Sequence, residues 1–217
     1  MRYLCLSKIY GLMPNFSSDA KVKTMPVTPE LVAELIRKRR SIFPKTYNRK
    51  PIPKAIIEEM LENANWAPTH RLTEPWRFKV FTGKALTRLG DYLGDFYLSN
   101  TPPAEFSEAK FNKSKESPKL SAYVVAICMQ RDAEARVPEW EELAAVACAV
   151  QNMWLTCTAH GIGSYWSTPK AALEAESFFG LAEGERCLGL FYMGYHDLPE
   201  LPGKRSPVAE KTTWILE

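Results

Sequence analysis

Residues 138–168 read PEWEELAAVACAVQNMWLTCTAHGIGSYWST, and no other stretch says more about the architecture of this chain. Its first part, 138–160, is the longest helical pattern, and apolar side chains lie on nearly every side of that helix. Such a helix is buried in a large core or in an interface between subunits. A chain of 217 residues has little room to bury it completely, so we predict a homodimer. Gly161 and Gly163 end the helix, and residues 164–167 are typical of a strand.

The segments on either side of this stretch alternate between helix and strand. Apolar residues at helical spacing predict helices that start at Thr28-Pro29 and that span 56–64 and 85–98. Apolar runs and alternating patterns predict strands at 76–81, 120–129 and 187–194. The charged, proline-containing segment 100–118 is a poor core element, and we expect it to form a mobile lid over a site. This order predicts one α/β or α+β domain.

The two ends of the chain differ in character from its middle. Residues 1–25 precede the first clear helix signal and are predicted to form an N-terminal arm, with the domain spanning 26–217. Residues 198–207 are rich in proline, and 212–216 are β-prone. A tail of this kind often pairs with the edge of a sheet, either its own or a partner's.

The composition is that of a soluble globular protein. The 28 Lys and Arg residues nearly balance the 25 Asp and Glu residues, and a net charge of +3 gives no strong case for binding nucleic acid. No apolar run approaches the ~18 residues of a membrane span. The five cysteines are odd in number and scattered, which argues against a disulfide framework and for a reducing compartment. We therefore predict a cytoplasmic protein without nucleic-acid or membrane partners.

This chain lacks the residues that mark several familiar kinds of active site. The three histidines have no metal-binding spacing, and no cysteine pair accompanies them, so no metal site is predicted. The G-x-S-x-G turn of many hydrolases is absent. Neither the G-x-G-x-x-G pattern nor a Walker A loop is present.

Two basic groups have the chemistry to hold a phosphate. Arg39, Arg40 and Ser41 follow the first helix, where guanidinium groups and a hydroxyl can donate to phosphate oxygens. The plain alternative is a solvated helix end, since basic residues suit the negative end of the helix dipole. Lys204 and Arg205 form a second basic pair in the tail, and their plain alternative is a solvated loop.

Two other segments suit a flat ring. Residues 66–76, WAPTHRLTEPW, carry Trp66, His70 and Thr73 on a loop that prolines make rigid; a rigid turn with buried tryptophans is the alternative. Residues 161–168, GIGSYWST, combine glycines that permit close backbone approach with amides that can donate hydrogen bonds. This segment equally fits a helix end followed by a buried strand.

Taken in order, these motifs resemble a known family. R-R-S after the first helix, A-P-x-H-x-x-x-x-P-W after the second, the long apolar helix, G-x-G-x-x-W and a late L-G-L-F-Y-M-G strand are similar to the nitroreductase-like FMN oxidoreductases. The resemblance runs from about Pro29 to the C-terminus, and the histidine in the second motif resembles a smaller subgroup of the family. It implies an α+β fold with a central mixed or antiparallel sheet flanked by helices. It also implies an intertwined homodimer with two FMN sites at its interface.

The resemblance also implies a set of FMN contacts. The residues implied to hold the ribityl and phosphate end are Arg39, Arg40 and Ser41, with Lys204 and Arg205 near the phosphate. The residues implied to reach the flavin, commonly from the other subunit, are Trp66 and His70. The segment implied to run past the ring or the ribityl chain consists of Tyr165, Trp166, Ser167 and Thr168. Many relatives carry an asparagine where Leu72 stands, so we expect His70 or Thr73 to read the pyrimidine edge instead. Some relatives carry an arginine where Ser167 stands.

The function implied by the resemblance is that of an FMN-dependent oxidoreductase. Hydride would pass from NADH or NADPH to flavin N5, and the electrons then to a flat, electron-poor small molecule such as a nitroaromatic, in a ping-pong sequence. No catalytic side chain is named, because the flavin carries the chemistry. The alternatives are a dehalogenase-like flavoenzyme of the same fold, a flavin-binding sensor or store with little turnover, and a nucleic-acid binder that uses residues 37–40.

Overall fold

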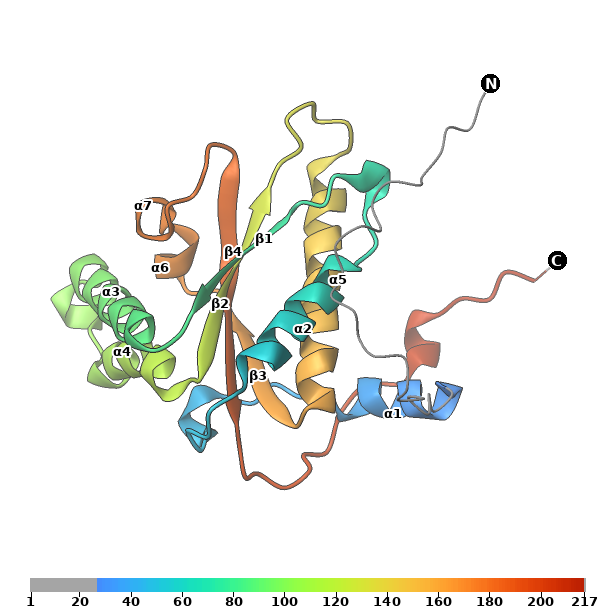
Figure 1. The fold of residues 1–217 in the computed structure, drawn as a ribbon, viewed down its shortest axis with the longest axis horizontal. Coiled ribbons are helices and arrows are strands. Elements are labelled where there is room, and N and C mark those ends of the chain that lie inside the picture. Colours follow the sequence, from blue (N-terminus) through green and yellow to red (C-terminus); the bar gives the residue numbers. More distant parts are fainter. Residues whose placement is uncertain (1–26, 217) are drawn as a thin grey trace, which may run out of the picture.

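The computed structural model describes residues 27–216, so the predicted arm at 1–25 lies outside the described residues. A four-stranded sheet in the order β1-β2-β4-β3 forms the centre, and all its neighbouring strands are antiparallel (Figure 1). The strands are β1 Trp76–Phe81, β2 Tyr123–Gln130, β3 Ile162–Ser167 and β4 Glu185–Tyr195. The sheet is thus antiparallel, which is one of the two arrangements that the resemblance implied.

Helices cover both faces of this sheet. One face carries α2 Lys54–Asn65 and α5 Glu139–Ala159 (Figure 1). The other face carries α3 Lys84–Asn100, α4 Glu108–Leu120, α6 Lys170–Leu173 and α7 Glu176–Phe179 (Figure 1). The first helix, α1 Pro29–Lys38, lies beside the C-terminal part of α5. As predicted, α1 begins at Thr28-Pro29, where the Thr28 side chain accepts a hydrogen bond from the Leu31 amide.

The central strands are apolar on both sides because each of their faces lies under helices. In β2, Val125, Ile127 and Met129 join the core beneath α5. The alternating residues Val124, Ala126 and Cys128 join the core beneath α3. All six side chains are fully buried. Because successive side chains in a strand point to opposite faces, one continuous apolar run supplies both cores.

The segment 100–118, expected to be a poor core element and a mobile lid, is largely helical. It contains a single turn, η3 Pro103–Glu105, and then the helix α4, which packs along α3. Ser107 caps α4 by accepting a hydrogen bond from the Lys110 amide. Pro118 lies in the last turn of α4, where the missing N–H removes only one bond before the helix ends. The segment therefore has regular local structure, and its movement as a lid stays a prediction.

The long helix α5 has two different faces in this chain. Val146, Ala149 and Met153 belong to the core and are fully buried. The opposite side carries an exposed apolar stripe at helical spacing, made of Trp140, Leu143, Ala144, Ala147 and Cys148. A stripe of this kind marks a surface for a partner.

The C-terminal tail does not join the sheet of its own chain. Residues 198–207 are extended, and a single turn follows at η4 Val208–Lys211. Trp214, Ile215 and Leu216 are each at least 80% exposed and belong to no strand. Pairing of this β-prone segment with a partner's sheet stays a prediction. Within residues 27–216, no helix has the length and apolar character needed to cross a membrane.

Candidate functional site

A cavity of about 750 Å³ lies beside the end of β3, on the face of the sheet that carries α3 and α4. This volume falls within the roughly 300–1,000 Å³ that is typical of small-molecule sites. Its apolar wall is largely aromatic and includes Phe43, Phe96, Tyr97, Tyr165 and Tyr192. The ring centres of Phe43 and Tyr165 lie 4.6 Å apart. The site therefore offers a preformed aromatic surface next to an edge strand.

The helix α4 supplies one polar side of the cavity. Lys110, Lys113, Ser114 and Ser117 line it, and their spacing of i, i+3, i+4 and i+7 places them on one side of the helix. The adjoining side of α4 rests on α3. A Cβ added to Gly90 would lie 2.2 Å from the Lys115 carbonyl oxygen, so this glycine allows the two helices to approach closely. That contact fixes which side of α4 faces the cavity.

The residues predicted from β3 divide between the two faces of the strand. Tyr165 and Ser167 line the cavity, as a ring-binding segment requires. Trp166 points to the opposite face, where it packs against the core beneath α5 and its indole N–H donates to the Leu188 carbonyl at 3.2 Å. Thr168 follows the strand and lies beside Gly189, whose φ of +132° is an angle that glycine adopts readily and other residues rarely adopt. Of the four residues, two therefore present their side chains to the cavity.

Residues 41–43 connect the end of α1 to this cavity along the edge of β3. Ser41 forms a parallel bridge with Ser164, and the Ile42 amide donates to the Ser164 carbonyl at 3.0 Å. Phe43 then reaches the cavity wall. The predicted phosphate residues and the aromatic cavity are thus joined by a short stretch of chain.

Arg39 lies among other positive charges. Its guanidinium Cζ sits 4.6 Å from the centre of the Trp154 ring. The pKa of Arg39 is lowered, first by partial burial and then by the nearby charges of Arg205 and Arg40. Within residues 27–216, none of these three arginines has a carboxylate oxygen within 4.0 Å. Positive charge without such a partner favours the binding of an anion.

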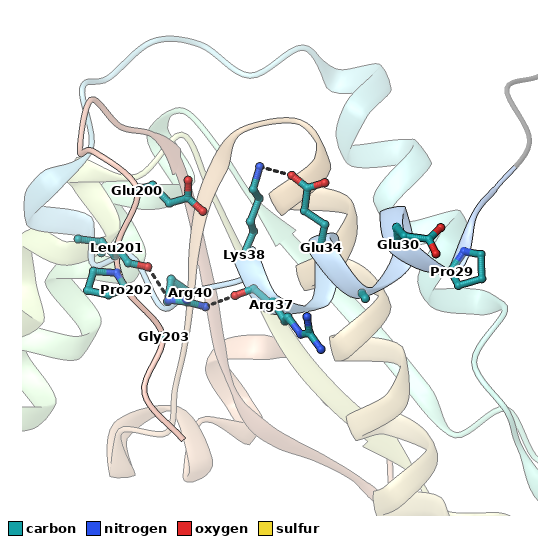
Figure 2. A pocket seen from close by; sticks show the side chains of 11 residues that line it. Pro29, Glu30, Glu34, Arg37, Lys38, Arg40, Glu200, Leu201, Pro202 and Gly203 are labelled. Carbon is teal, nitrogen blue, oxygen red and sulfur yellow. Dashed lines mark hydrogen bonds and ion pairs between the residues drawn. The ribbon is translucent and has the colours of Figure 1, made fainter. Parts of the chain in front are cut away.

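Arg40 has a structural role. Its Nε donates to the Leu201 carbonyl at 2.9 Å, and its Nη1 donates to the Arg37 and Arg39 carbonyls. Figure 2 shows the bond to Leu201, which joins the tail to the end of α1, and the local bond to Arg37. The hollow of about 890 Å³ between α1 and the tail is lined by both acidic and basic side chains. Lys204 is exposed, and its carbonyl accepts a hydrogen bond from Arg205.

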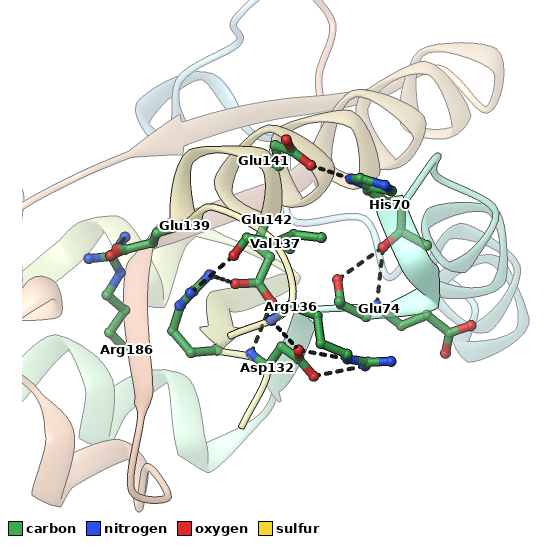
Figure 3. A network of polar contacts seen from close by, with 12 residues as sticks. His70, Glu74, Asp132, Arg136, Val137, Glu139, Glu141, Glu142 and Arg186 are labelled. Carbon is green, nitrogen blue, oxygen red and sulfur yellow. Dashed lines mark hydrogen bonds and ion pairs between the residues drawn. The ribbon is translucent and has the colours of Figure 1, made fainter. Parts of the chain in front are cut away.

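The remaining predicted residues lie near the N-terminal end of α5. The His70 Nδ1 atom is 2.6 Å from a carboxylate oxygen of Glu141, and the imidazole is 59% exposed (Figure 3). The loop is held in an unusual shape, because Arg71, Leu72 and Glu74 all have positive φ angles. Such strain accumulates where a loop serves a function.

Trp66 and Thr73 complete this second group. Trp66 is 78% exposed, and its indole N–H donates to Glu62 at 3.0 Å. The Thr73 hydroxyl lies 3.3 Å from that of Thr69. The exposed indole of Trp66 and the exposed imidazole of His70 are each available to a ligand or to another chain.

A single chain does not bring the two groups together. His70 contacts Glu141, whereas Arg39 contacts Trp154, thirteen residues further along α5. At 1.5 Å per residue the two ends are about 20 Å apart. The expectation that Trp66 and His70 reach a cofactor bound by the other subunit is compatible with this separation and stays a prediction.

Comparison with known proteins identifies the family of this chain. A sequence model described as the nitroreductase family matches residues 36–195, which is most of the chain. The chain belongs to the nitroreductase family. A protein of Bacillus subtilis, YfhC, is named for NAD(P)H nitroreductase activity and is 32% identical over 199 residues, covering 87% of this chain and 99% of that one. The family resemblance that the sequence motifs suggested is therefore confirmed.

Solved structures agree with this nitroreductase fold. A nitroreductase-like family protein from Bacillus cereus superimposes with a TM-score of 0.70 at 24% identity, covering 94% of this chain and 99% of that one. The FMN-dependent nitroreductase NfnB from Mycobacterium smegmatis, solved in complex with NADPH, gives a TM-score of 0.68 at 18% identity. That match covers 85% of this chain and 98% of NfnB. At these identities the likeness establishes the fold.

The α4 residues of the cavity were not foreseen from the sequence. Lys110, Lys113, Ser114 and Ser117 sit in a segment whose charges and prolines suggested a lid. Their helical spacing could have predicted one polar face of a helix, but a search for apolar stripes does not detect such a face. Within residues 27–216, no group of three or more His, Cys, Asp and Glu side chains could hold a metal ion.

Proposed function

We propose that this nitroreductase-family chain is an FMN-dependent oxidoreductase that takes electrons from NADH or NADPH and passes them to a flat, electron-poor small molecule. The observation that carries the proposal is the short path of chain that runs from Arg39, beside Trp154, along the edge of β3 at Ser41 and Ile42 to Phe43 in the wall of the aromatic cavity. FMN has the same two ends, an anionic phosphate and a flat ring. The donors present on this path therefore fit the cofactor.

We assign the two ends of FMN to different residues along this path. We assign the phosphate to Arg39 and Arg205, because arginine and phosphate form charge-assisted hydrogen bonds. We assign the ring to the cavity wall at Phe43 and Tyr165. Ser164 turns its carbonyl outward to the Ile42 amide, so two residues further along this edge strand the Trp166 amide also points outward and can donate to a ligand. When bound, FMN supplies the acceptance and return of hydride that side chains do not provide.

We further propose that the working unit is a homodimer in the cytoplasm. The exposed apolar stripe of α5 supplies an interface, and the C-terminal segment 212–216 is available to a neighbouring chain. In a symmetric pair, the His70 group of one chain would complete the Arg39 group of the other. In this arrangement each site combines the two groups that a single chain keeps apart.

The visible spectrum of the purified protein tests the proposal. The spectrum is recorded without oxygen, first alone, then after NADH, and in a separate sample after NADPH. Flavin bands that bleach on addition support the oxidoreductase and identify the preferred donor. Bands that persist with both donors point instead to a flavin sensor or store. A colourless protein that takes up no added FMN would overturn the proposal.

A further inference from the structure

The charges around the β3 cavity are all of one sign. Four lysines line it, namely Lys45, Lys110, Lys113 and Lys170, and no aspartate or glutamate does. The lysines are exposed, whereas Leu93 and Ala171 in the same wall are buried. The cavity therefore has an apolar, aromatic interior and a rim of positive charge.

The positive rim is not balanced by neighbouring carboxylates. In the described part of the chain, Lys45, Lys110 and Lys113 have no carboxylate oxygen within 4.0 Å, and Lys170 has only Glu174 at 3.6 Å. The lysines on the other side of α4 behave differently. Lys115 and Lys119 lie 3.9 Å and 3.1 Å from Asp91 of α3. Along one helix, the lysines that face α3 are paired and those that face the cavity are free.

This distribution discriminates between classes of aromatic ligand. Because Phe43 and Tyr165 are assigned to the flavin, the ring of the acceptor packs against Phe96 and Tyr97 of the same wall, and an attached anion is stabilised by the lysine rim. A cationic ligand is repelled by the same rim. A zwitterionic amino acid would place its ammonium group where no acidic side chain is available. A neutral ring makes the apolar contacts only.

We propose that the electron acceptor of this enzyme is an anionic aromatic compound, such as a nitroarene that carries a carboxylate or sulfonate. The inference rests on the proposed function and specifies its substrate. For a nitro group, NAD(P)H delivers two electrons and one proton, and a second proton comes from water. The nitro group becomes a nitroso group, one N–O bond breaks, and the oxygen leaves as water.

Matched nitroarenes test the charge preference on the FMN-loaded enzyme. The kcat/KM value is measured for anionic 4-nitrobenzoate and neutral 4-nitrobenzamide at low ionic strength. We expect the ratio of the two values to fall steadily as salt is added, because exposed charges are screened over a Debye length of about 3 Å at 1 M salt. A ratio that does not change with salt contradicts the proposal.

Variants of α4 locate the preference. Lys110→Gln and Lys113→Gln should each lower the ratio by roughly fivefold, the effect of losing a favourable exposed ion pair. Lys115→Gln is the matched control, since it removes the same charge from the same helix on the side that faces α3. It should leave the ratio unchanged. Because each comparison uses the same two substrates, their intrinsic reactivities cancel.

Equilibrium binding separates recognition from turnover. Calorimetric titration of the holoenzyme with benzoate and benzamide, which it does not reduce, should show tighter binding of benzoate. The difference should shrink in Lys110→Gln and Lys113→Gln but not in Lys115→Gln. If these variants lose FMN while the ratio stays the same, the lysines hold the cofactor and the inference is wrong. If the native protein binds no FMN, the proposed function itself fails.

Discussion

Arg39 is the side chain on which the cofactor proposal can be tested most directly. Replacing it with alanine removes a charge-assisted contact worth roughly 1.5–3 kcal/mol, so the Kd for FMN should rise about 10- to 100-fold. The Kd is measured by titrating the stripped protein with FMN and following flavin fluorescence. Arg88→Ala, an exposed change on α3, is the control and should bind as the native protein does. Native affinity in Arg39→Ala would remove Arg39 from the site.

His70 tests the other half of the proposed site. We expect His70→Ala to weaken FMN binding or to shift the flavin absorption bands, because the imidazole then no longer reaches the ring. Glu141→Gln should give a smaller change of the same kind, since it removes the carboxylate that orients Nδ1. Glu139→Gln is the control, because Glu139 pairs with Arg186 instead. Identical spectra and affinities in all three variants would exclude the His70 loop from the site.

The helix pair α3 and α4 shows how elements position the cavity. Gly90→Ala would push its new methyl group into the Lys115 backbone, and we expect a destabilisation of about 1–3 kcal/mol from overpacking. Gly94→Ala is the matched comparison, since its nearest neighbour is a side-chain carbon at 3.3 Å. Urea unfolding followed by circular dichroism measures both. Equal stabilities would show that the two helices can separate without cost.

At the same scale, the elements differ in how well the sequence predicts them. The strand at 76–81 follows from its alternating pattern, and the long helix follows from its length and its glycine end. The helix α4 escaped prediction because the side that it turns toward the cavity is polar, so it carries no apolar stripe to mark a buried face. The prolines and the many charges also made the segment a poor candidate for a core element. The missed cavity residues belong to this same helix.

The relation between chains is the feature of the whole molecule that matters most for the proposal. Ala147→Glu places a charge in the exposed apolar stripe of α5, and we expect it to convert a dimer into a monomer. Light scattering coupled to size-exclusion chromatography gives the mass. Ala109→Glu, at the start of α4, makes the same exchange at an exposed position outside this stripe and should leave the mass unchanged. A native protein that is already monomeric would contradict the homodimer.

At this scale the sequence predicts both an apolar surface and a homodimer, and the structure of one chain shows the surface. The apolar residues on all sides of 138–160 indicate that α5 needs more than one layer of cover, and the structure shows which of them the chain leaves exposed. The site is harder to foresee, because one chain keeps Arg39 and His70 at different places along α5, and only the proposed homodimer would bring them together. The residues by themselves do not tell which copy supplies each part, and it was the family resemblance that implied contacts from the other subunit.

The position of these two groups at opposite ends of α5 has a genetic consequence. Two alleles, one with Arg39 replaced and one with His70 replaced, should each give lowered activity when expressed alone with limiting FMN. Expressed together, the proposed homodimer forms some mixed pairs in which one site receives both defects and the other receives neither. The two genes together should therefore give more activity in one cell than either gives alone.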